Sequence, residues 1–280
     1  MSKTANTGSG IAQAPANTFN PQAAAAILVE RRRAGIQGDR LPETCRPQNL
    51  EQAMAVQDAV TAHWCASMDD SIGGWKCLLP SEDKWVVGPI YTRTIDSVPP
   101  VSLWAKAGTA GERARIEPEL AFFFGVDLPP RSEPYLPEDV DAAIVRTHMA
   151  LELIEGRYAD PASCKFPEML ADGLVNQGLF IGPEVDSKAA AAASSFTIHV
   201  QCGDGETFER QGQHPNLNPR APLYWLAEFL RSRGQGIVAG QAVITGSYAG
   251  VLEVPLNTEI RIDYAGLGQM TASFTAKQRR

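Results

Sequence analysis

The chain has few cysteines, and they form no recognisable pattern. The five cysteines are odd in number, widely spaced and never arranged as C-x-x-C, which argues against a disulfide framework and a zinc ribbon. No apolar run reaches the roughly 18 residues that a membrane-spanning helix needs. The most apolar stretch near the start, residues 23–29, precedes Arg31, Arg32 and Arg33, whereas a secretory signal has its positive charge first. We therefore expect a cytoplasmic protein with no membrane partner.

Basic residues are in the minority in this sequence. The chain has 25 Lys and Arg residues against 32 Asp and Glu residues, which gives a net charge of −7. This balance argues against a broad nucleic-acid-binding surface, because such a surface needs a basic patch. A single pocket can still bind an anionic substrate. With 280 residues, 44% of them hydrophobic, the chain can bury a large core without disulfides.

The most familiar catalytic signatures are missing as well. The sequence contains no G-x-G-x-x-G, Walker P-loop, H-E-x-x-H or G-x-S-x-G motif. These absences argue against the commonest dinucleotide-binding, nucleotide-hydrolysing, zinc-protease and serine-hydrolase sites. The four histidines share no spacing typical of metal ligands, and we interpret them as structural or surface residues.

Three regions are predicted along the chain. Residues 1–20 are small and polar, and we expect a disordered tail. Residues 21–72 are predicted to be an N-terminal helical region, with an Ala-rich helix that ends near Gly35 and a second helix over residues 47–68. Residues 73–280 read as a β-rich catalytic core. The predicted fold class is therefore α+β, with a β-rich core decorated by helices.

Within the core, apolar patterns predict short strands and two further helices. The sequence Gly-Asp-Gly at residues 203–205 predicts a β-hairpin. The Ala-rich residues 188–193 are of low complexity and are predicted to form a surface connection. Strands are predicted at residues 115–125, 196–202, 206–210, 242–245, 258–264 and 269–275, and helices at residues 137–146 and 221–233.

Two glutamates stand at the start of a strongly apolar strand candidate. Alternation along the strand places Glu117 and Glu119 on one face, and both faces are apolar after Glu119. Neighbouring carboxylates in such a place repel each other and lose hydration, and a bound cation would remove both costs. Alternatively, both lie at an exposed strand start and pair with Arg113 or Arg115. Pro118 cannot donate to a sheet ladder, which favours an edge, a strand start or a bulge.

A third glutamate lies in a segment whose secondary structure is ambiguous. As a helix, residues 149–158 would present Glu152 and Glu155 on a solvated face. As a strand, they would place Glu152 alone beside the apolar Ala150 and Ile154. A lone buried carboxylate needs a partner, which a cation held by the first two glutamates would supply. Three oxygen ligands are typical of Mg²⁺ or Mn²⁺, and the remaining coordination positions could take a chelating substrate.

At these residues the chain resembles the fumarylacetoacetate hydrolase superfamily, in its 2-keto-4-pentenoate hydratase / 2-oxo-3-enedioate decarboxylase branch. The resemblance runs from about residue 57 to residue 274 and depends on the order of several short motifs. These motifs are G-W-K at residues 74–76, I-E-P-E-L-A-F at 116–122, A-L-E-L-I-E-G-R at 150–157, A-D-G at 171–173, G-Q-A-V-I-T-G-S at 240–247 and L-G-Q-M at 267–270.

The resemblance implies a mixed, rolled β-sheet and a divalent metal cofactor, Mg²⁺ or Mn²⁺. Members act on small 2-oxo or enol acids from aromatic ring-cleavage pathways, and they are usually oligomeric, so a homo-oligomer is expected. The candidate site residues are Glu117, Glu119 and Glu152 for the metal, Lys76 and Asp172 for catalysis, and Trp75 and Ser247 for substrate binding.

The expected activity is hydration of a small 2-hydroxydienoate by a metal-dependent lyase. A 2-oxo acid offers a carboxylate oxygen and a ketone oxygen to a hard cation, which would stabilise an enolate. The same ligands would serve a 2-oxo-3-enedioate decarboxylase or an acylpyruvate-type carbon–carbon hydrolase, and a binding paralogue without activity is a further alternative.

Three departures from the family pattern suggest a different or bulkier substrate. Cys77 and Leu78 follow the lysine, where members usually have a small apolar residue and glycine. Gly173 follows the aspartate, where members usually have asparagine, and Pro118 stands inside the E-x-E motif.

Overall fold

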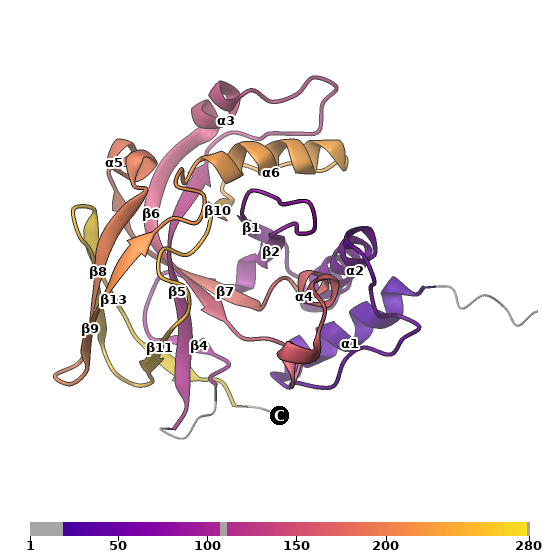
Figure 1. The fold of residues 1–280 in the computed structure, drawn as a ribbon, viewed down its shortest axis with the longest axis horizontal. Helices are drawn as coiled ribbons and strands as arrows, with labels where there is room; N and C mark the ends of the chain where they lie inside the picture. Colours follow the sequence, from indigo (N-terminus) through magenta and orange to yellow (C-terminus); the bar gives the residue numbers. More distant parts are fainter. Residues whose placement is uncertain (1–18, 107–110, 279–280) are drawn as a thin grey trace, which may run out of the picture.

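The computed structural model describes residues 19–106 and 111–278 (Figure 1). The predicted tail, residues 1–20, lies outside the described residues except for Phe19 and Asn20. Phe19 packs against the hydrophobic core, and the Asn20 side chain accepts a hydrogen bond from the backbone N–H of Ala23. These two residues therefore belong to the folded part of the chain.

Two helices precede the first strand, as predicted. Helix α1 (Pro21–Ala34) ends at Gly35, and helix α2 (Leu50–Met68) begins after Asn49, whose side chain accepts from the backbone N–H of Gln52. A side-chain acceptor at this position satisfies an N–H group that the first helical turn leaves free, which explains why the second helix starts three residues later than predicted. The helices pack on each other, and α2 also contacts the short helix α4 (Phe166–Ala171) (Figure 1).

A mixed, curled sheet forms the centre of the described structure (Figure 1). The strands run in the order β2-β1-β10-β5-β6-β7-β3, and β11 pairs with the free part of β5. The β1–β10 and β3–β7 pairs are parallel, and the other pairs are antiparallel. The strands are β1 (Ile72–Cys77), β2 (Val87–Tyr91), β3 (Ile95–Asp96), β5 (Arg113–Phe124), β6 (Ile144–Ile154), β7 (Asn176–Val185), β10 (Ala242–Ile244) and β11 (Leu252–Pro255).

A smaller antiparallel sheet has the order β13-β12-β8-β9. It contains the predicted hairpin, which joins β8 to β9. The fold class predicted from the sequence, a β-rich α+β fold with a mixed, rolled sheet, is confirmed. The strands of this sheet are β8 (Ser195–Cys202), β9 (Thr207–Gln213), β12 (Ile260–Tyr264) and β13 (Gly268–Ala272), and β14 (Phe274–Ala276) pairs separately with β4 (Val101–Leu103).

Two predictions of secondary structure are corrected. Residues 188–193 were expected to be a surface connection, but helix α5 (Ser187–Ala192) covers most of them. Asp186 caps this helix, and Ala190 is fully buried in the core. The helix forms because alanine has a high helix propensity and because the cap and the buried contact stabilise it. The helix predicted over residues 137–146 ends earlier, as α3 (Pro137–Ala143), because the β-branched residues that follow pair with β5.

The remaining helical segments are two short connections and one longer helix that packs over the sheet. The predicted helix near residues 221–233 is α6 (Ala221–Ser232), which lies over the sheet near β1 and β10 (Figure 1). Two 3₁₀ turns, η1 (Thr92–Thr94) and η2 (Pro161–Ser163), connect strands and helices. In the described part of the chain, no helix is long and apolar enough to span a membrane.

Alternation along β5 separates a core face from a site face. Ile116 and Leu120 belong to the main hydrophobic core, whereas Ala121 belongs to a small cluster on the opposite side. Glu117 and Glu119 share the side of Ala121, as the period of two predicts. The sheet therefore carries its acidic residues on the face that is not filled by the main core.

Pro118 occupies a local edge rather than a bulge. The Pro118 carbonyl accepts the backbone N–H of Tyr248 and therefore points away from β6. The nitrogen and the carbonyl of one strand residue point to the same side, so the Pro118 nitrogen also points away from β6. On that side, Pro118 lies between the segment of β5 that pairs with β11 and the segment that pairs with β10. The register with β6 is regular here, with Pro118 opposite Leu151, and the irregularity lies farther on, between Phe123 and Phe124. The proline therefore interrupts no hydrogen bond between β5 and β6.

Candidate metal centre

The register between β5 and β6 assembles the three glutamates. Glu117 lies directly opposite Glu152, and Glu119 lies one pleat farther along on the same face. One carboxylate oxygen from each residue lies within 4.8 Å of the others. The segment that was ambiguous in the sequence is therefore a strand, and Glu152 is fully buried on it. The helical alternative for this segment is wrong.

Hydrogen bonds hold two of the three carboxylates and leave one oxygen open. Glu119 Oε2 accepts the backbone N–H of Gly246 at 2.7 Å. Glu152 Oε1 accepts from Lys76 Nζ at 2.6 Å and from Asn176 Nδ2 at 2.8 Å. Glu152 Oε2 is buried, yet it has no hydrogen-bond partner among the described residues. A buried oxygen in this position is suited to coordinate a cation.

The electrostatics of the cluster also favour a divalent cation. Burial, reinforced by the charge of Glu152, raises the pKa of Glu117 to about 7. Burial, followed by the charges of Glu152 and Glu117, raises the pKa of Glu119 well above its usual value. Burial acts to lower the pKa of Lys76, but the negative charge of Glu152 and then Glu117 outweighs it and raises this pKa. Three carboxylates and one ammonium leave two negative charges, which a dication would neutralise.

Gly246 supplies its amide at a position that favours glycine. Its φ is +121°, and a Cβ atom here would lie 2.5 Å from Cδ2 of Leu78. Residues with a Cβ atom rarely adopt this backbone conformation, which favours glycine here. The loop after β10 can therefore approach Glu119 closely enough to donate its N–H.

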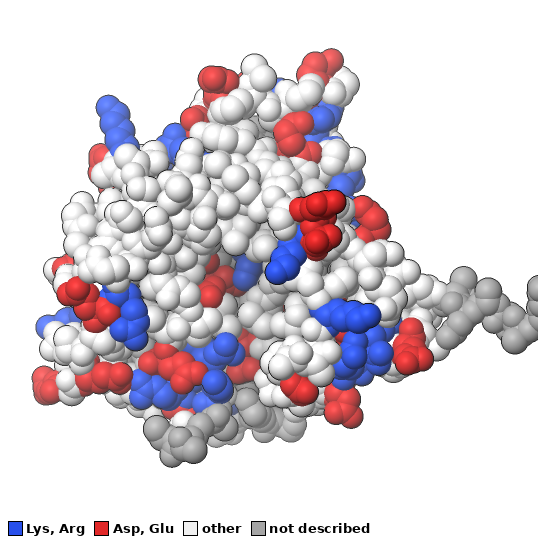
Figure 2. Space-filling model, in the orientation of Figure 1, with Lys and Arg blue, Asp and Glu red and all other residues white. Residues whose placement is uncertain are grey.

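A cavity of about 280 Å³ lies next to the glutamates. The face drawn in Figure 2 is hollowed near its centre, where acidic and basic side chains meet, close to the positions of β1, β5 and β7 in Figure 1. Ser247 is at the edge of the cavity, where its hydroxyl donates to the carbonyl groups of Pro118 and Gly250. Besides the glutamates and Lys76, the walls include Cys77, Leu78, Val86 and Pro215.

Trp75, a candidate for substrate binding, is not at this cavity. Successive residues of β1 point to opposite faces of the sheet, and Trp75 belongs to the main core while Lys76 faces the glutamates. The indole Nε1 of Trp75 donates to Gln241 Oε1 at 3.2 Å. Trp75 therefore packs on the opposite face of the sheet, in the main core, and does not line the cavity.

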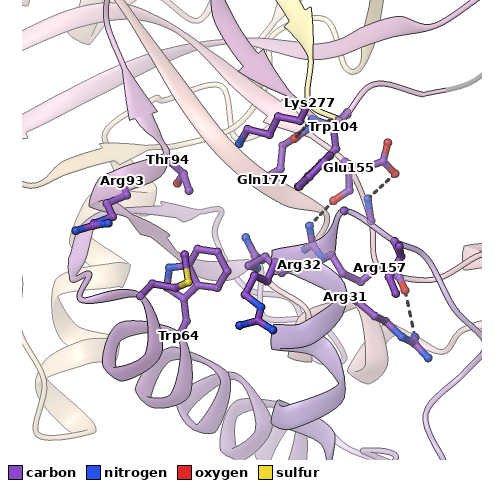
Figure 3. Close-up of a pocket in the computed structure, with 15 residues that line it drawn as sticks. Arg31, Arg32, Trp64, Arg93, Thr94, Trp104, Glu155, Arg157, Gln177 and Lys277 are labelled. Atoms are coloured by element: carbon purple, nitrogen blue, oxygen red, sulfur yellow. Dashed lines mark hydrogen bonds between the residues drawn. The ribbon is translucent and has the colours of Figure 1, made fainter. Parts of the chain in front are cut away.

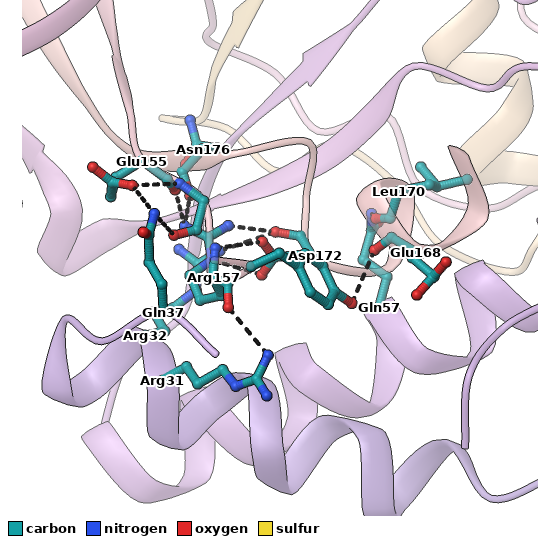
Figure 4. Close-up of polar contacts among 12 residues, drawn as sticks. Arg31, Arg32, Gln37, Gln57, Glu155, Arg157, Glu168, Leu170, Asp172 and Asn176 are labelled. Atoms are coloured by element: carbon teal, nitrogen blue, oxygen red, sulfur yellow. Dashed lines mark hydrogen bonds and ion pairs between the residues drawn. The ribbon is translucent and has the colours of Figure 1, made fainter. Parts of the chain in front are cut away.

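Asp172, a candidate for catalysis, is also absent from the walls of this cavity. Its carboxylate is buried and accepts from Arg157 Nε at 2.6 Å and from the Arg157 backbone N–H at 3.3 Å (Figure 4). Gly173 beside it has a φ of +72°, in the left-handed region that asparagine also tolerates. This backbone conformation explains why glycine can stand where the resemblance implies asparagine.

Arg157 connects Asp172 to the metal centre. Its Nη1 donates to the carbonyl of Asn176 at 2.9 Å (Figure 4). The Asn176 side chain in turn donates to Glu152. Asp172 therefore lies at one end of a chain of buried contacts that reaches Glu152. Asn176 was missed from the sequence, because an isolated asparagine before an apolar strand has the same appearance as an ordinary turn residue.

Known proteins that are similar to this chain include two hydratases and a decarboxylase. No family model matches the sequence. The chain is similar to 2-keto-4-pentenoate hydratase 2 from Dechloromonas aromatica (strain RCB), with 23% identity over 92% of this chain and 98% of the relative. It is also similar to 2-keto-4-pentenoate hydratase 1 of the same organism, with 22% identity and the same coverage.

A solved structure, 4-oxalocrotonate decarboxylase from Pseudomonas putida G7 complexed with magnesium and adipate, has the same fold. The TM-score is 0.72, with 20% identity over 91% of this chain and 97% of the other. The resemblance to the hydratase and decarboxylase branch of the fumarylacetoacetate hydrolase superfamily, predicted from the motifs, is confirmed by these likenesses.

The metal centre predicts the effect of removing one charge from Glu152. Glu152→Gln should bind Mg²⁺ at least about tenfold more weakly, because a contact charge pair contributes several kcal/mol even in a fairly polar environment. Isothermal titration with Mg²⁺ measures the change. Glu184→Gln, an exposed substitution on the neighbouring strand β7, is the control and should bind like the wild type. Equal affinity of Glu152→Gln and wild type would remove Glu152 from the ligand set.

The position of Asp172 predicts a loss of stability. Asp172→Asn leaves the buried Arg157 guanidinium without its anion and should lower the free energy of unfolding by about 3–5 kcal/mol. Urea unfolding measures this difference. Glu253→Gln breaks an exposed ion pair with Lys106 and should cost about 1 kcal/mol or less. If Asp172→Asn is as stable as this control, the ion pair does not position the loop.

Proposed function

We propose that the protein is a hydratase of a small 2-hydroxydienoate or 2-oxo acid that uses Mg²⁺ or Mn²⁺. The observation that carries the proposal is the buried, unpartnered Oε2 of Glu152, which lies beside Glu117 and Glu119 at the edge of a cavity. An all-oxygen donor set fits hard divalent cations better than softer metals. The magnesium in the decarboxylase complex of similar fold supports this choice.

Glu117, Glu119 and Glu152 would hold the cation at the base of the cavity. When bound, the cation would supply positive charge where negative charge develops on the oxygen atoms of a 2-oxo acid. Gly246 and Asn176 keep Glu119 and Glu152 in place through the hydrogen bonds described above. The protein's own part in this arrangement is therefore to fix the carboxylates before substrate arrives.

Lys76 is placed to bind the carboxylate of the substrate. Its ammonium donates to Glu152 Oε1 at 2.6 Å and to the Leu174 carbonyl at 3.2 Å. An ammonium group has three donors, so one N–H remains for a ligand in the cavity that Lys76 lines. The two bonds to the protein hold the side chain in one orientation and reduce the entropy that substrate binding would cost.

The walls of the cavity favour hydration over decarboxylation of an enedioate. Among the described residues that line it, Lys76 is the only cation, and Leu78, Val86 and Pro215 contribute apolar surface. An enedioate carries a second carboxylate, which would be desolvated against this surface without a partner. A monocarboxylate with a short unsaturated tail would fit both the cation and the apolar surface. Ser247, whose hydroxyl makes only long hydrogen bonds of 3.3–3.4 Å, would contact the substrate from the side.

The assay for the proposed function follows the ultraviolet absorbance of a 2-hydroxydienoate. Purified protein with Mg²⁺ should consume 2-hydroxypenta-2,4-dienoate, and exhaustive chelation with EDTA should abolish the reaction. Readdition of Mg²⁺ or Mn²⁺ should restore it. Release of CO₂ from a 2-oxo-3-enedioate without hydration of the dienoate would favour the decarboxylase alternative. Full activity after chelation would overturn the role of the cation.

Lys76→Met should lower kcat/KM by about 10- to 100-fold, because a hydrogen bond to a charged group contributes about 1.5–3 kcal/mol. The affinity for Mg²⁺ should not fall, since the substitution removes a positive charge beside the carboxylates. Steady-state kinetics and isothermal titration measure the two effects separately. Lys188→Met, an exposed substitution, is the control. Loss of Mg²⁺ binding in Lys76→Met would mean that Lys76 shapes the metal centre and does not bind substrate.

A further inference from the structure

A second cavity, of about 200 Å³, shares no lining residue with the metal centre. It lies where helices α1 and α2 approach β7 and the segment after β14, and Figure 3 shows the side chains around it. Most of the titratable side chains that reach this cavity are basic. The molecule as a whole is acidic, so this local excess of positive charge is not a consequence of composition.

Arg32 is buried at this cavity without an acidic partner. Its side chain makes one long hydrogen bond, from Nη2 to the carbonyl of Asp172 at 3.4 Å, and none of the described carboxylates lies within ion-pair distance. The guanidinium lies over the rings of Trp64 and Tyr91, at 5.8 and 5.4 Å. Burial and then the charge of Arg157 lower the pKa of Arg32 to about 10. A desolvated charge of this kind is costly unless an anion joins it.

Two further cations reach the cavity from other parts of the chain. Arg93 belongs to η1, and Lys277 follows β14 and lies 5.5 Å from the ring centre of Trp104. Within the described structure, neither side chain has a hydrogen bond or an ion pair with an acid. Figure 3 shows Arg93, Lys277 and Arg32 at three different sides of the cavity. Three cations from three segments therefore line one cavity.

The other charged residues around the cavity are already paired. Arg31 donates to the carbonyl groups of Asp39 and Arg157, and Arg33 pairs with Glu30. Arg157 is held by Asp172, and the Glu155 carboxylate accepts from Gln37. These contacts have an ordinary structural explanation. Arg32, Arg93 and Lys277 have no ion pair among the described residues, and they mark the part of the cavity that is suited to an anion.

Apolar side chains define the rest of the cavity. Trp64, Met68 and Trp104 line it together with the cations. Aromatic walls next to a guanidinium suit a flat organic acid, because the ring packs on the walls while the acid group meets the cation. Inorganic phosphate would satisfy the charges but leave the apolar walls without contacts. The small volume restricts the ligand to about one ring.

We propose that this cavity binds a small aromatic or unsaturated carboxylic acid, with its carboxylate at Arg32 and its apolar body against Trp64 and Trp104. Lys277 and Arg93 attract the anion at the rim and bind its second oxygen. The site is separate from the metal centre, so its occupation does not depend on the proposed function.

Benzoate is a suitable probe, and isothermal titration of the full chain measures its binding. Benzoate should bind with the same affinity in EDTA and in Mg²⁺, because the site requires no metal. Benzamide has the same ring without the charge and should bind at least tenfold more weakly. Inorganic phosphate should also bind more weakly than benzoate. A requirement for Mg²⁺ would place benzoate at the metal centre and overturn the proposal.

Two variants localise the site. Arg32→Gln should weaken benzoate binding at least tenfold. Lys277 is an exposed residue, and Lys277→Gln should weaken binding about threefold. Arg210→Gln, an exposed substitution on β9, is the control and should bind benzoate normally. Unchanged affinity in Lys277→Gln, together with either unchanged affinity or misfolding of Arg32→Gln, would overturn the proposal.

A competing occupant is an acidic segment of a second copy of the chain. Sedimentation velocity with and without benzoate distinguishes the two. An oligomeric state that is insensitive to benzoate and to Lys277→Gln supports a small-molecule site. Dissociation caused by either one would show that the cavity is an interface between copies, and the proposed ligand site would be wrong.

Discussion

Repulsion among three carboxylates, two of them buried and one half-buried, is the constraint on which the rest of this structure depends. Glu117, Glu119 and Glu152 are brought together by strand register, and the burial that a reaction site needs makes their charges costly. One ammonium, from Lys76, offsets part of this charge, and the unpartnered oxygen of Glu152 remains. The site is thus complete only with a cation. Stability given up at such a position is typical of functional sites.

The position of the Glu152 carboxylate depends on residues that do not touch it directly. Glu152 is held by Asn176, whose carbonyl accepts from Arg157, and Arg157 is held by Asp172. This chain of contacts extends from the sheet to the loop beside helices α1 and α2. Because each member is buried and charged or strongly polar, removal of one leaves the next without a partner. Asp172 is therefore tied to the metal centre although it does not touch the cavity.

The charged side chains that line the two cavities are mostly of opposite sign. The metal centre concentrates negative charge on one sheet face, and the second cavity concentrates positive charge between the helices and the sheet. Arg157 lies between them, since it contacts both Asn176 and the wall of the basic cavity. Each cavity contains one buried charged group that lacks a partner among the described residues. In the first cavity, Glu152 Oε2 has no hydrogen-bond partner, and in the second, Arg32 has no ion pair. In both cases the missing partner has the opposite sign and is small enough to enter from solvent.

The sequence by itself determined what depends on local patterns: the first helix up to Gly35, the alternating faces of β5, the hairpin between β8 and β9, and the motif order that resembles the family. Tertiary structure decided the rest. Whether Glu152 lay on a helix or a strand depended on pairing with β5, and helix α3 gave way to β6 for the same reason. Trp75 and Asp172 stand next to the right motifs, but pleat direction and a buried ion pair turn them away from the cavity. Local propensity did not distinguish helix from strand in these segments. Long-range strand pairing, which cannot be read from a single sequence, determined the outcome.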